Sequence, residues 1–125
     1  MLINLSNHPS SLWSEAQTKA ATLKYGQVID FSFPAIDPKA EPYEIDYQTE
    51  TFQVKLLQLL AGENLGLQAV HVMGELTFCF ALVARLQKNG ITCLASTTDR
   101  ITIDNSDGSK TTQFGFVRFR EYGRI

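Results

Sequence analysis

The stretch that decides the fold is LQAVHVMGE, residues 67–75. Residues 67–73 are almost continuously hydrophobic, which is typical of a strand buried on both faces in the middle of a parallel sheet. Gly74 and Glu75 then open a helix from Leu76 to Asn89, whose first half is apolar nearly all round. A buried strand that passes directly into a helix indicates an α/β fold.

The segments on either side repeat this alternation. Apolar periodicity predicts further strands at residues 2–6, 27–33 and 91–95, and further helices from about residue 14 to Gly26 and over 44–61. Residues 101–104 and 113–121 alternate by twos around Asp107-Gly108, which is a strong hairpin signal. We therefore expect a single domain over residues 1–125. It should be a three-layer, Rossmann-like sandwich with a mainly parallel sheet in the order 2-1-3-4 and a C-terminal β-hairpin.

Composition narrows the function classes. The chain has 125 residues, 44% of them hydrophobic, which is enough for one core. A net charge of -2 and a pI near 5.6 argue against binding long nucleic acid, which normally requires a basic face. No apolar run reaches the roughly 18 residues of a membrane span, and the N-terminus lacks the pattern of a secretory signal. We expect a cytoplasmic protein that does not engage a membrane.

Metal and cofactor chemistry have little support in the sequence. Cys79 and Cys93 lie in apolar runs, where buried reduced thiols are expected and a disulfide is the minor alternative. His8 and His71 are the only histidines and no cysteine pair is closely spaced, so neither a zinc site nor a Cys-His nucleophile is indicated. The common nucleotide-binding and hydrolase motifs are missing. No metal ligand and no cofactor is predicted.

Three polar clusters follow predicted strands. They are Ser6-Asn7-His8-Pro9, Met73-Gly74-Glu75 and Ser96-Thr97-Thr98-Asp99-Arg100. In an open α/β sheet, ligands bind at the carboxyl ends of the strands where the strand order reverses. With the order 2-1-3-4 the three clusters become neighbours at that edge, so they predict one pocket.

The residue types in these clusters suit a phosphorylated ligand. His8 can transfer a proton to or from a ribose hydroxyl, although a merely exposed histidine is the alternative. Arg100 carries a planar fork that matches phosphate oxygens. Gly74 lets a phosphate approach the helix start, where Glu75 either binds the ligand or interacts with the helix dipole. Hydroxyl and amide groups that position a ligand, or else serve as turns and caps, come from Ser6, Asn7, Ser96, Thr97 and Thr98.

Two further features point to packing. His71 lies inside a predicted strand, which favours a core or interface role. The last strand places Phe114, Phe116, Arg118 and Arg120 on one face and Val117, Phe119 and Glu121 on the other. A face that mixes aromatic and charged side chains is typical of a subunit contact, with snorkelling edge arginines as the alternative. Together with the apolar start of the helix at Leu76, it predicts a homodimer.

With these clusters assembled, the chain resembles small stand-alone CRISPR-associated proteins with a CARF-like Rossmann domain. The resemblance implies binding of cyclic oligoadenylate, the second messenger of type III CRISPR defence, across a homodimer. It also implies metal-independent ring cleavage, in which a ribose 2′-hydroxyl attacks its neighbouring phosphodiester. Arg100 and the helix start at Gly74 would stabilise charge, and His8 would carry the proton. None of the clusters contains a lysine, which departs from many CARF sites. A non-catalytic module that sequesters this messenger or senses another nucleotide is the alternative, and a structural subunit without a small ligand is the third.

Overall fold

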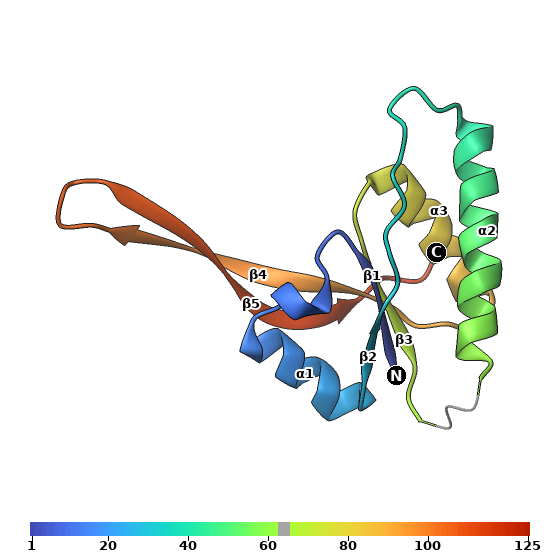
Figure 1. The fold of residues 1–125 in the computed structure, drawn as a ribbon, viewed down its shortest axis with the longest axis horizontal. Helices are drawn as coiled ribbons and strands as arrows, with labels where there is room; N and C mark the ends of the chain where they lie inside the picture. The colour runs from blue at the N-terminus through green and yellow to red at the C-terminus, as the bar shows by residue number, and fades with distance from the viewer. Residues whose placement is uncertain (63–65) are drawn as a thin grey trace.

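The computed structural model describes residues 1–62 and 66–125. It forms an α/β domain from which a long β-hairpin projects (Figure 1). Along the chain the elements are β1 (Leu2–Ser6), the short 3-10 helix η1 (Ser10–Leu12), α1 (Glu15–Tyr25), β2 (Val28–Asp30), α2 (Pro42–Leu60), β3 (Ala69–Met73), α3 (Leu76–Lys88), β4 (Cys93–Asp104) and β5 (Lys110–Glu121).

The sheet has the order β2-β1-β3-β4-β5, and every neighbouring pair is parallel except β4 with β5. This confirms the predicted α/β fold, the order 2-1-3-4 and the C-terminal hairpin. Figure 1 shows α1 on one face of the sheet and α2 with α3 on the other. The larger core lies between the sheet and the helices α2 and α3, and a smaller one lies under α1. β3 is therefore buried on both faces, as its hydrophobic run predicted, and β1 is buried in the same way.

Local sequence signals explain the helix boundaries. Ser14 caps α1 by accepting a hydrogen bond from the Gln17 amide, and Gly26 ends the helix with a φ of 83°, a conformation that favours glycine. α2 begins at Pro42, two residues before the predicted start, because Glu41 and Glu44 form a reciprocal capping box there. The expected helices are all present.

β2 is shorter than predicted. It ends at Asp30 because the chain then leaves the sheet and uses its aromatic side chains to fill the core beneath α2 and α3. Phe31 packs edge to face on Phe52 with ring centroids 5.6 Å apart, and Phe33 packs on Phe78 at 5.3 Å.

β4 is much longer than predicted. The expected strand at residues 91–95 followed by a polar loop is wrong, because residues 93–104 form one strand that includes the whole Ser96–Arg100 cluster. Pairing with β3 covers only Cys93 and Leu94, whereas pairing with β5 runs from Leu94 to Asp104. The Asp107-Gly108 turn, with Gly108 at a φ of 86°, closes this hairpin where the sequence predicted it.

A β-bulge corrects the predicted faces of the last strand. The register shifts between Thr97 and Thr98, which pair with Arg118 and Phe116, so Val117 is the extra residue. The bulge reverses the alternation beyond it and brings Phe119 beside Phe116, with ring centroids 5.0 Å apart. Phe114, Phe116 and Phe119 therefore lie on one side at the base of the hairpin. The prediction that Phe116 shares a face with Arg118 and Arg120 is wrong.

Both cysteines are free and buried. Burial, with smaller effects of nearby acidic groups, raises the pKa of Cys79 to about 11 and that of Cys93 to about 12. They are inert small hydrophobes, as expected. Over the described ranges, no helix has both the length and the apolar character needed to cross a bilayer.

Candidate functional site

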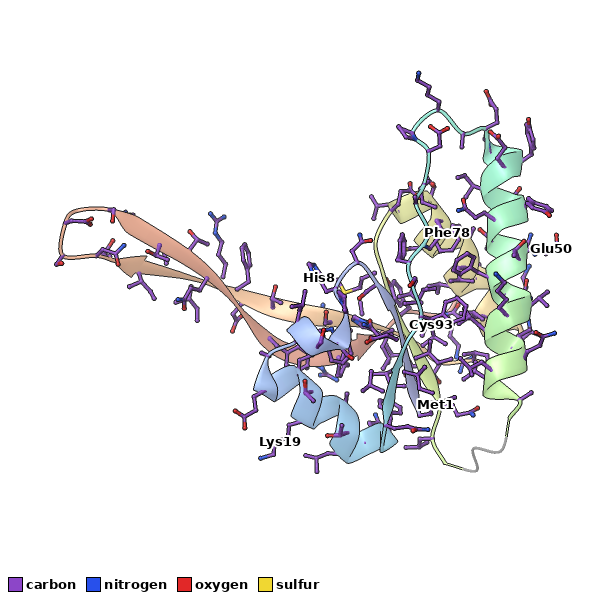
Figure 2. The ribbon with its side chains drawn as sticks, viewed as in Figure 1. Met1, His8, Lys19, Glu50, Phe78 and Cys93 are labelled. Carbon is purple, nitrogen blue, oxygen red and sulfur yellow. The ribbon has the colours of Figure 1, made fainter. Side chains whose placement is uncertain are left out.

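A pocket of about 600 Å³ lies at the carboxyl ends of β1 and β3, where the strand order reverses. We call it the carboxyl-edge pocket. Its lining residues are Ser6, His8, Leu12, Trp13, Ser14, Gln17, His71, Met73, Ser96, Thr98, Phe114 and Phe116. They come from β1, η1 and its flanking turns, α1, β3, and the base of the hairpin. His8 marks this part of the molecule in Figure 2.

A row of polar side chains crosses the sheet below the pocket. Asn4 of β1 is the register partner of Asp30 in β2 and of His71 in β3, so the three residues lie side by side on adjacent strands. Asn4 Nδ2 donates to Asp30 Oδ1 at 2.9 Å and to the His8 carbonyl oxygen at 2.8 Å. Asn4 Oδ1 accepts from Ser6 Oγ at 2.8 Å. Since the partners of Nδ2 only accept hydrogen bonds, the orientation of the Asn4 amide is determined.

This orientation determines the tautomer of His71. The Nδ1 atom lies 2.9 Å from Asn4 Oδ1, which can only accept, so Nδ1 carries the proton of the neutral ring. The Nε2 atom is then a bare acceptor. It is buried and is the one buried side-chain polar atom without a partner in the part of the chain that the structure describes. Burial, with a smaller contribution from His8, lowers the pKa of His71 to about 4, so the ring is neutral at physiological pH.

Asp30 anchors the other end of the row. Its carboxylate accepts hydrogen bonds from Asn4, from the Ser10 amide at 3.0 Å and from Ser10 Oγ at 2.8 Å. Partial burial opposes ionisation of this group, but the hydrogen bonds outweigh it and lower the pKa of Asp30. An ionised Asp30 therefore holds the Asn4 amide in the orientation that keeps the proton on His71 Nδ1 and leaves Nε2 unprotonated.

Aromatic rings cover the imidazole. Trp13, the only tryptophan of the chain, packs edge to face on His71 with ring centroids 5.5 Å apart. Phe119 of β5 packs on His71 in the same way, also with centroids 5.5 Å apart. Trp13 Nε1 donates to the His8 carbonyl oxygen at 3.2 Å, which ties the loop after β1 to the start of α1. The site thus combines a buried acceptor with flat apolar surfaces.

The structure brings four of the predicted site residues together. Ser6, His8, Ser96 and Thr98 all line the pocket. The backbone around His8 is organised by the buried network, whereas the His8 side chain is exposed. Asn7 is also exposed but does not line the pocket.

Gly74 and Glu75 do not line the pocket, and both have structural roles. The Glu75 carboxylate caps α3 by accepting from the amides of Thr77 at 3.0 Å and Phe78 at 2.8 Å. It occupies the amide groups that were expected to attract phosphate. Gly74 is small because a Cβ there would come within 2.3 Å of the Phe33 ring.

Thr97 and Arg100 lie on the hairpin. Thr97 Oγ1 donates to the Arg118 carbonyl oxygen at 3.2 Å across the strand pair and does not line the pocket. Arg100 is exposed and pairs with Phe114, two residue pairs outward from the Thr98 and Phe116 pair. Because alternate residues share a face, Arg100 is on the same face as Thr98, at the outer margin of the pocket.

Sequence reasoning missed the row formed by Asp30, Asn4 and His71. A usable signal was present, since each is a polar residue inside an otherwise apolar strand, in the segments VID, LINLS and AVHVM. A buried polar side chain needs partners, and three such residues in adjacent strands can provide them for one another. Trp13 was missed because it lies outside the regular elements.

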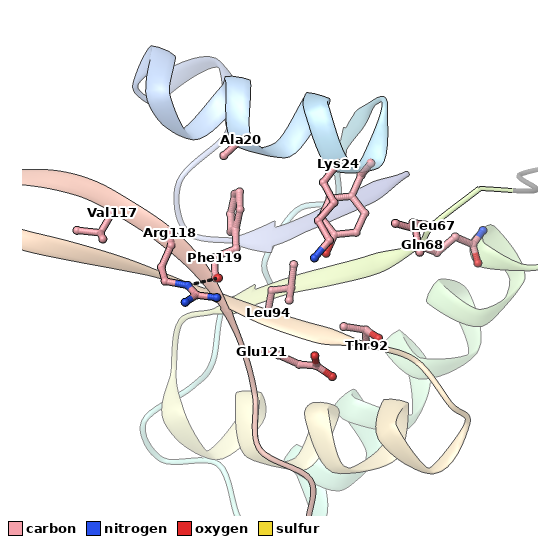
Figure 3. Close-up of a pocket in the computed structure, with 11 residues that line it drawn as sticks. Ala20, Lys24, Leu67, Gln68, Thr92, Leu94, Val117, Arg118, Phe119 and Glu121 are labelled. Atoms are coloured by element: carbon pink, nitrogen blue, oxygen red, sulfur yellow. Dashed lines mark hydrogen bonds between the residues drawn. The ribbon is translucent and has the colours of Figure 1, made fainter.

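A second pocket, of about 670 Å³, lies at the opposite end of the sheet between α1 and the hairpin (Figure 3). Leu94 and Phe119 form its apolar floor, while Lys24 and Glu121 are placed around it. It involves the amino ends of β3 and β4, marked by Gln68 and Thr92. The unpaired acceptor of His71 belongs to the carboxyl-edge pocket, which is therefore the stronger candidate.

Comparison with known proteins gives one match. A family model described as the Uncharacterized protein MJ1673 family matches residues 1–120. Neither the curated proteins nor the solved structures gave a match.

Proposed function

The chain belongs to the Uncharacterized protein MJ1673 family, and we propose that it binds a cyclic oligoadenylate messenger in the carboxyl-edge pocket and cleaves it without a metal ion. The observation that carries this proposal is the combination of a bare buried acceptor, His71 Nε2, with aromatic walls and hydroxyl groups in one pocket. The volume of the carboxyl-edge pocket is within the range of about 300–1,000 Å³ that is usual for small-molecule sites.

Each part of an adenine nucleotide has a counterpart in this pocket. The rings of Trp13 and Phe116 offer faces on which a base can stack, an interaction worth about 1–3 kcal/mol per base. The hydroxyls of Ser96 and Thr98 can bond ribose and phosphate oxygens, whereas Ser6 Oγ donates its proton to Asn4 Oδ1 and can only accept from a ribose hydroxyl. The donor that His71 lacks is available on both adenine and ribose.

Cleavage requires one proton to leave the attacking group and one to reach the leaving group. The ribose 2′-oxygen would form a bond to phosphorus while the bond from phosphorus to the 5′-oxygen breaks, which leaves a cyclic phosphate end. His8, exposed at the pocket, is the residue we assign to proton transfer. Arg100 would stabilise the negative charge that develops on the non-bridging phosphate oxygens, from the hairpin face next to the pocket.

A symmetric ring would require two pockets, so we also propose that the protein acts as a homodimer in the cytoplasm. Exposed apolar side chains on α3 support a subunit contact, since Leu76 is 82% and Phe80 67% accessible. Sedimentation is expected to show a dimer at micromolar concentration. A monomer that still binds the ring with full affinity would contradict the two-pocket arrangement.

The reaction can be tested directly. The protein would be incubated with cyclic tri-, tetra- and hexa-adenylate in EDTA, and the products resolved by chromatography. We expect His8→Ala to bind the messenger normally and to cleave it roughly 100-fold more slowly. Lys19→Ala, an exposed change on α1, serves as the matched control and should cleave at the normal rate.

The non-catalytic alternative has one observation in its favour. The residues that line the pocket include no Lys or Arg, so charge stabilisation depends on Arg100 outside it. Tight binding without turnover by the unaltered protein would establish this alternative. If none of the three rings changes the melting temperature or the Trp13 fluorescence, both cleavage and sequestration of cyclic oligoadenylate are refuted.

A further inference from the structure

We propose that His71 selects the ligand of the carboxyl-edge pocket: its Nε2 atom accepts a hydrogen bond from an N–H or O–H group of the bound nucleotide, and ligands without that donor are rejected. This inference rests on the proposed function and adds to it the residue that determines specificity. It also gives Asn4 and Asp30 a role as positioning residues that hold His71 in the accepting tautomer.

The hydrogen-bond network prevents His71 from moving its proton to Nε2, so the lone pair of Nε2 stays available. Asn4 Oδ1 already accepts from Ser6 Oγ and from His71 Nδ1, and its Nδ2 is held by Asp30 and the His8 carbonyl oxygen. Moving the proton of His71 to Nε2 would place two acceptors against each other at 2.9 Å. The network of three adjacent strands therefore makes Nε2 a permanent acceptor.

Burial of His71 Nε2 without a hydrogen-bond partner is unfavourable for the free energy of the unliganded protein. His71 is only 2% exposed, and a buried acceptor without a partner loses the hydrogen bond that it would make with water. A purely structural site would be expected to fill this position with an apolar residue or to supply a donor. A ligand that brings a donor recovers the cost on binding, while a ligand without one leaves it in place.

His71 can accept a hydrogen bond from the ligand, but it is not suited to act as a general base. A general base works best when its pKa is near the operating pH, and His71 is far more acidic than that. The ionisable groups recorded around it are His8, which disfavours its protonation, and Asp30, which lies behind the Asn4 amide. His71 is thus suited to recognise a donor, whereas the exposed His8 remains the group for proton transfer.

Access to Nε2 involves Trp13. The Trp13 ring packs on the imidazole, and its Nε1 bond to the His8 carbonyl oxygen is long, at 3.2 Å. A base or ribose that reaches Nε2 would have to shift this ring or stack on it. Because Trp13 is the only tryptophan, its fluorescence reports this event without a label.

The donor could be the 6-amino group of adenine or the 2′-hydroxyl of ribose, and the two are separable with synthetic ligands. Trp13 fluorescence titrations would compare the best-binding cyclic oligoadenylate with a ring of purine ribosides, which lacks the amino group, and a ring of 2′-deoxyadenylates. We expect one analogue to bind at least about 10-fold more weakly than the parent, in line with an unpaired buried acceptor. The weak analogue identifies the donor.

Variants assign this discrimination to His71. In His71→Phe, which keeps a ring but has no acceptor, the parent and the weak analogue should bind with equal affinity. Lys19→Ala, an exposed change on α1 away from the pocket, is the control and should keep the full discrimination. Since His71→Phe could disturb the fold, the tautomer would also be measured in the unaltered protein by nitrogen NMR, where we expect a protonated Nδ1 and a bare Nε2.

The outcomes distinguish the two proposals. If no ring binds the unaltered protein, the proposed function fails and this inference fails with it. If the parent ring binds and both analogues bind as tightly as the parent, only the role of His71 is refuted. A protonated Nε2 in the NMR spectrum would refute it as well.

Discussion

Lowering the pH from 8 to 5 should destabilise the protein through His71. In the unfolded chain this histidine has its ordinary pKa of 6.5, while in the folded protein burial and the nearby His8 lower the pKa to about 4. Above the unfolded value the ring is neutral in both states and contributes no pH dependence. Between the two values the unfolded state binds more protons, so stability falls as the pH falls.

The size of the effect follows from the two pKa values. At pH 5 the unfolded histidine is almost fully protonated and the folded one almost fully neutral, so the free energy of unfolding should be about 2 kcal/mol lower than at pH 8. The contribution of His71 to this loss should level off below pH 4 at about 3 kcal/mol. The pKa values of Asp30 and Glu75 are lowered, so these carboxylates stay ionised at pH 5 and do not mask the effect.

Urea unfolding at the two pH values, followed by circular dichroism, would measure this difference. His71→Phe has no group to titrate at this position, so its loss between pH 8 and pH 5 should be smaller than that of the unaltered protein by about 2 kcal/mol. His8→Ala should keep most of the loss, because burial is the larger cause of the low pKa of His71. Equal losses in the unaltered protein and in His71→Phe would show that His71 is protonated in the folded state or is not buried.

Three further changes test other parts of the description. Glu75→Ala removes the cap of α3 and should lower the free energy of unfolding by about 1 kcal/mol in urea titrations, whereas an unchanged stability would reject the capping role. Gly74→Ala forces a Cβ into the Phe33 ring and should cost roughly 1–3 kcal/mol by the same measurement; a neutral result would mean that this ring moves freely. Arg100→Ala should weaken messenger binding by about 1.5–3 kcal/mol in calorimetric titrations with no change in melting temperature, and full affinity would remove Arg100 from the site.

The sequence was most informative where a signal is local. The run at residues 69–73 identified a central strand because burial on both faces leaves few polar positions. Ser14 and Gly26 marked the ends of α1 because capping involves only residues of the same turn. The order of these elements, together with right-handed crossovers, favoured a three-layer sandwich, for which we expected the strand order 2-1-3-4.

The extent of β4 could not be predicted in this way. The cluster from Ser96 to Arg100 is polar, and polar residues after a buried strand usually form a loop. Here they remain in a strand because β5 pairs with them far beyond the edge of β3. Threonine has a high strand propensity, but this segment forms a strand and not a loop only because β5 pairs with it.

His71 shows the same limit at the site. Within its own strand it has the pattern of a core histidine, and it is indeed buried. Its chemical character depends on Asn4, 67 residues away in the sequence, whose amide orientation depends in turn on Asp30. No local pattern contains that information.

The sequence by itself therefore determined the fold class, the order of the strands and the edge of the sheet where polar groups gather, because hydrophobic periodicity and capping act over a few residues. Only the tertiary structure decided which polar groups share a pocket and in what state. The register of three strands aligns Asp30, Asn4 and His71, and the bulge at Val117 brings Phe116 to the side of Phe119, whose ring packs on the imidazole. Register and burial depend on contacts between distant segments, and they are what leave one nitrogen of His71 with a lone pair and no partner.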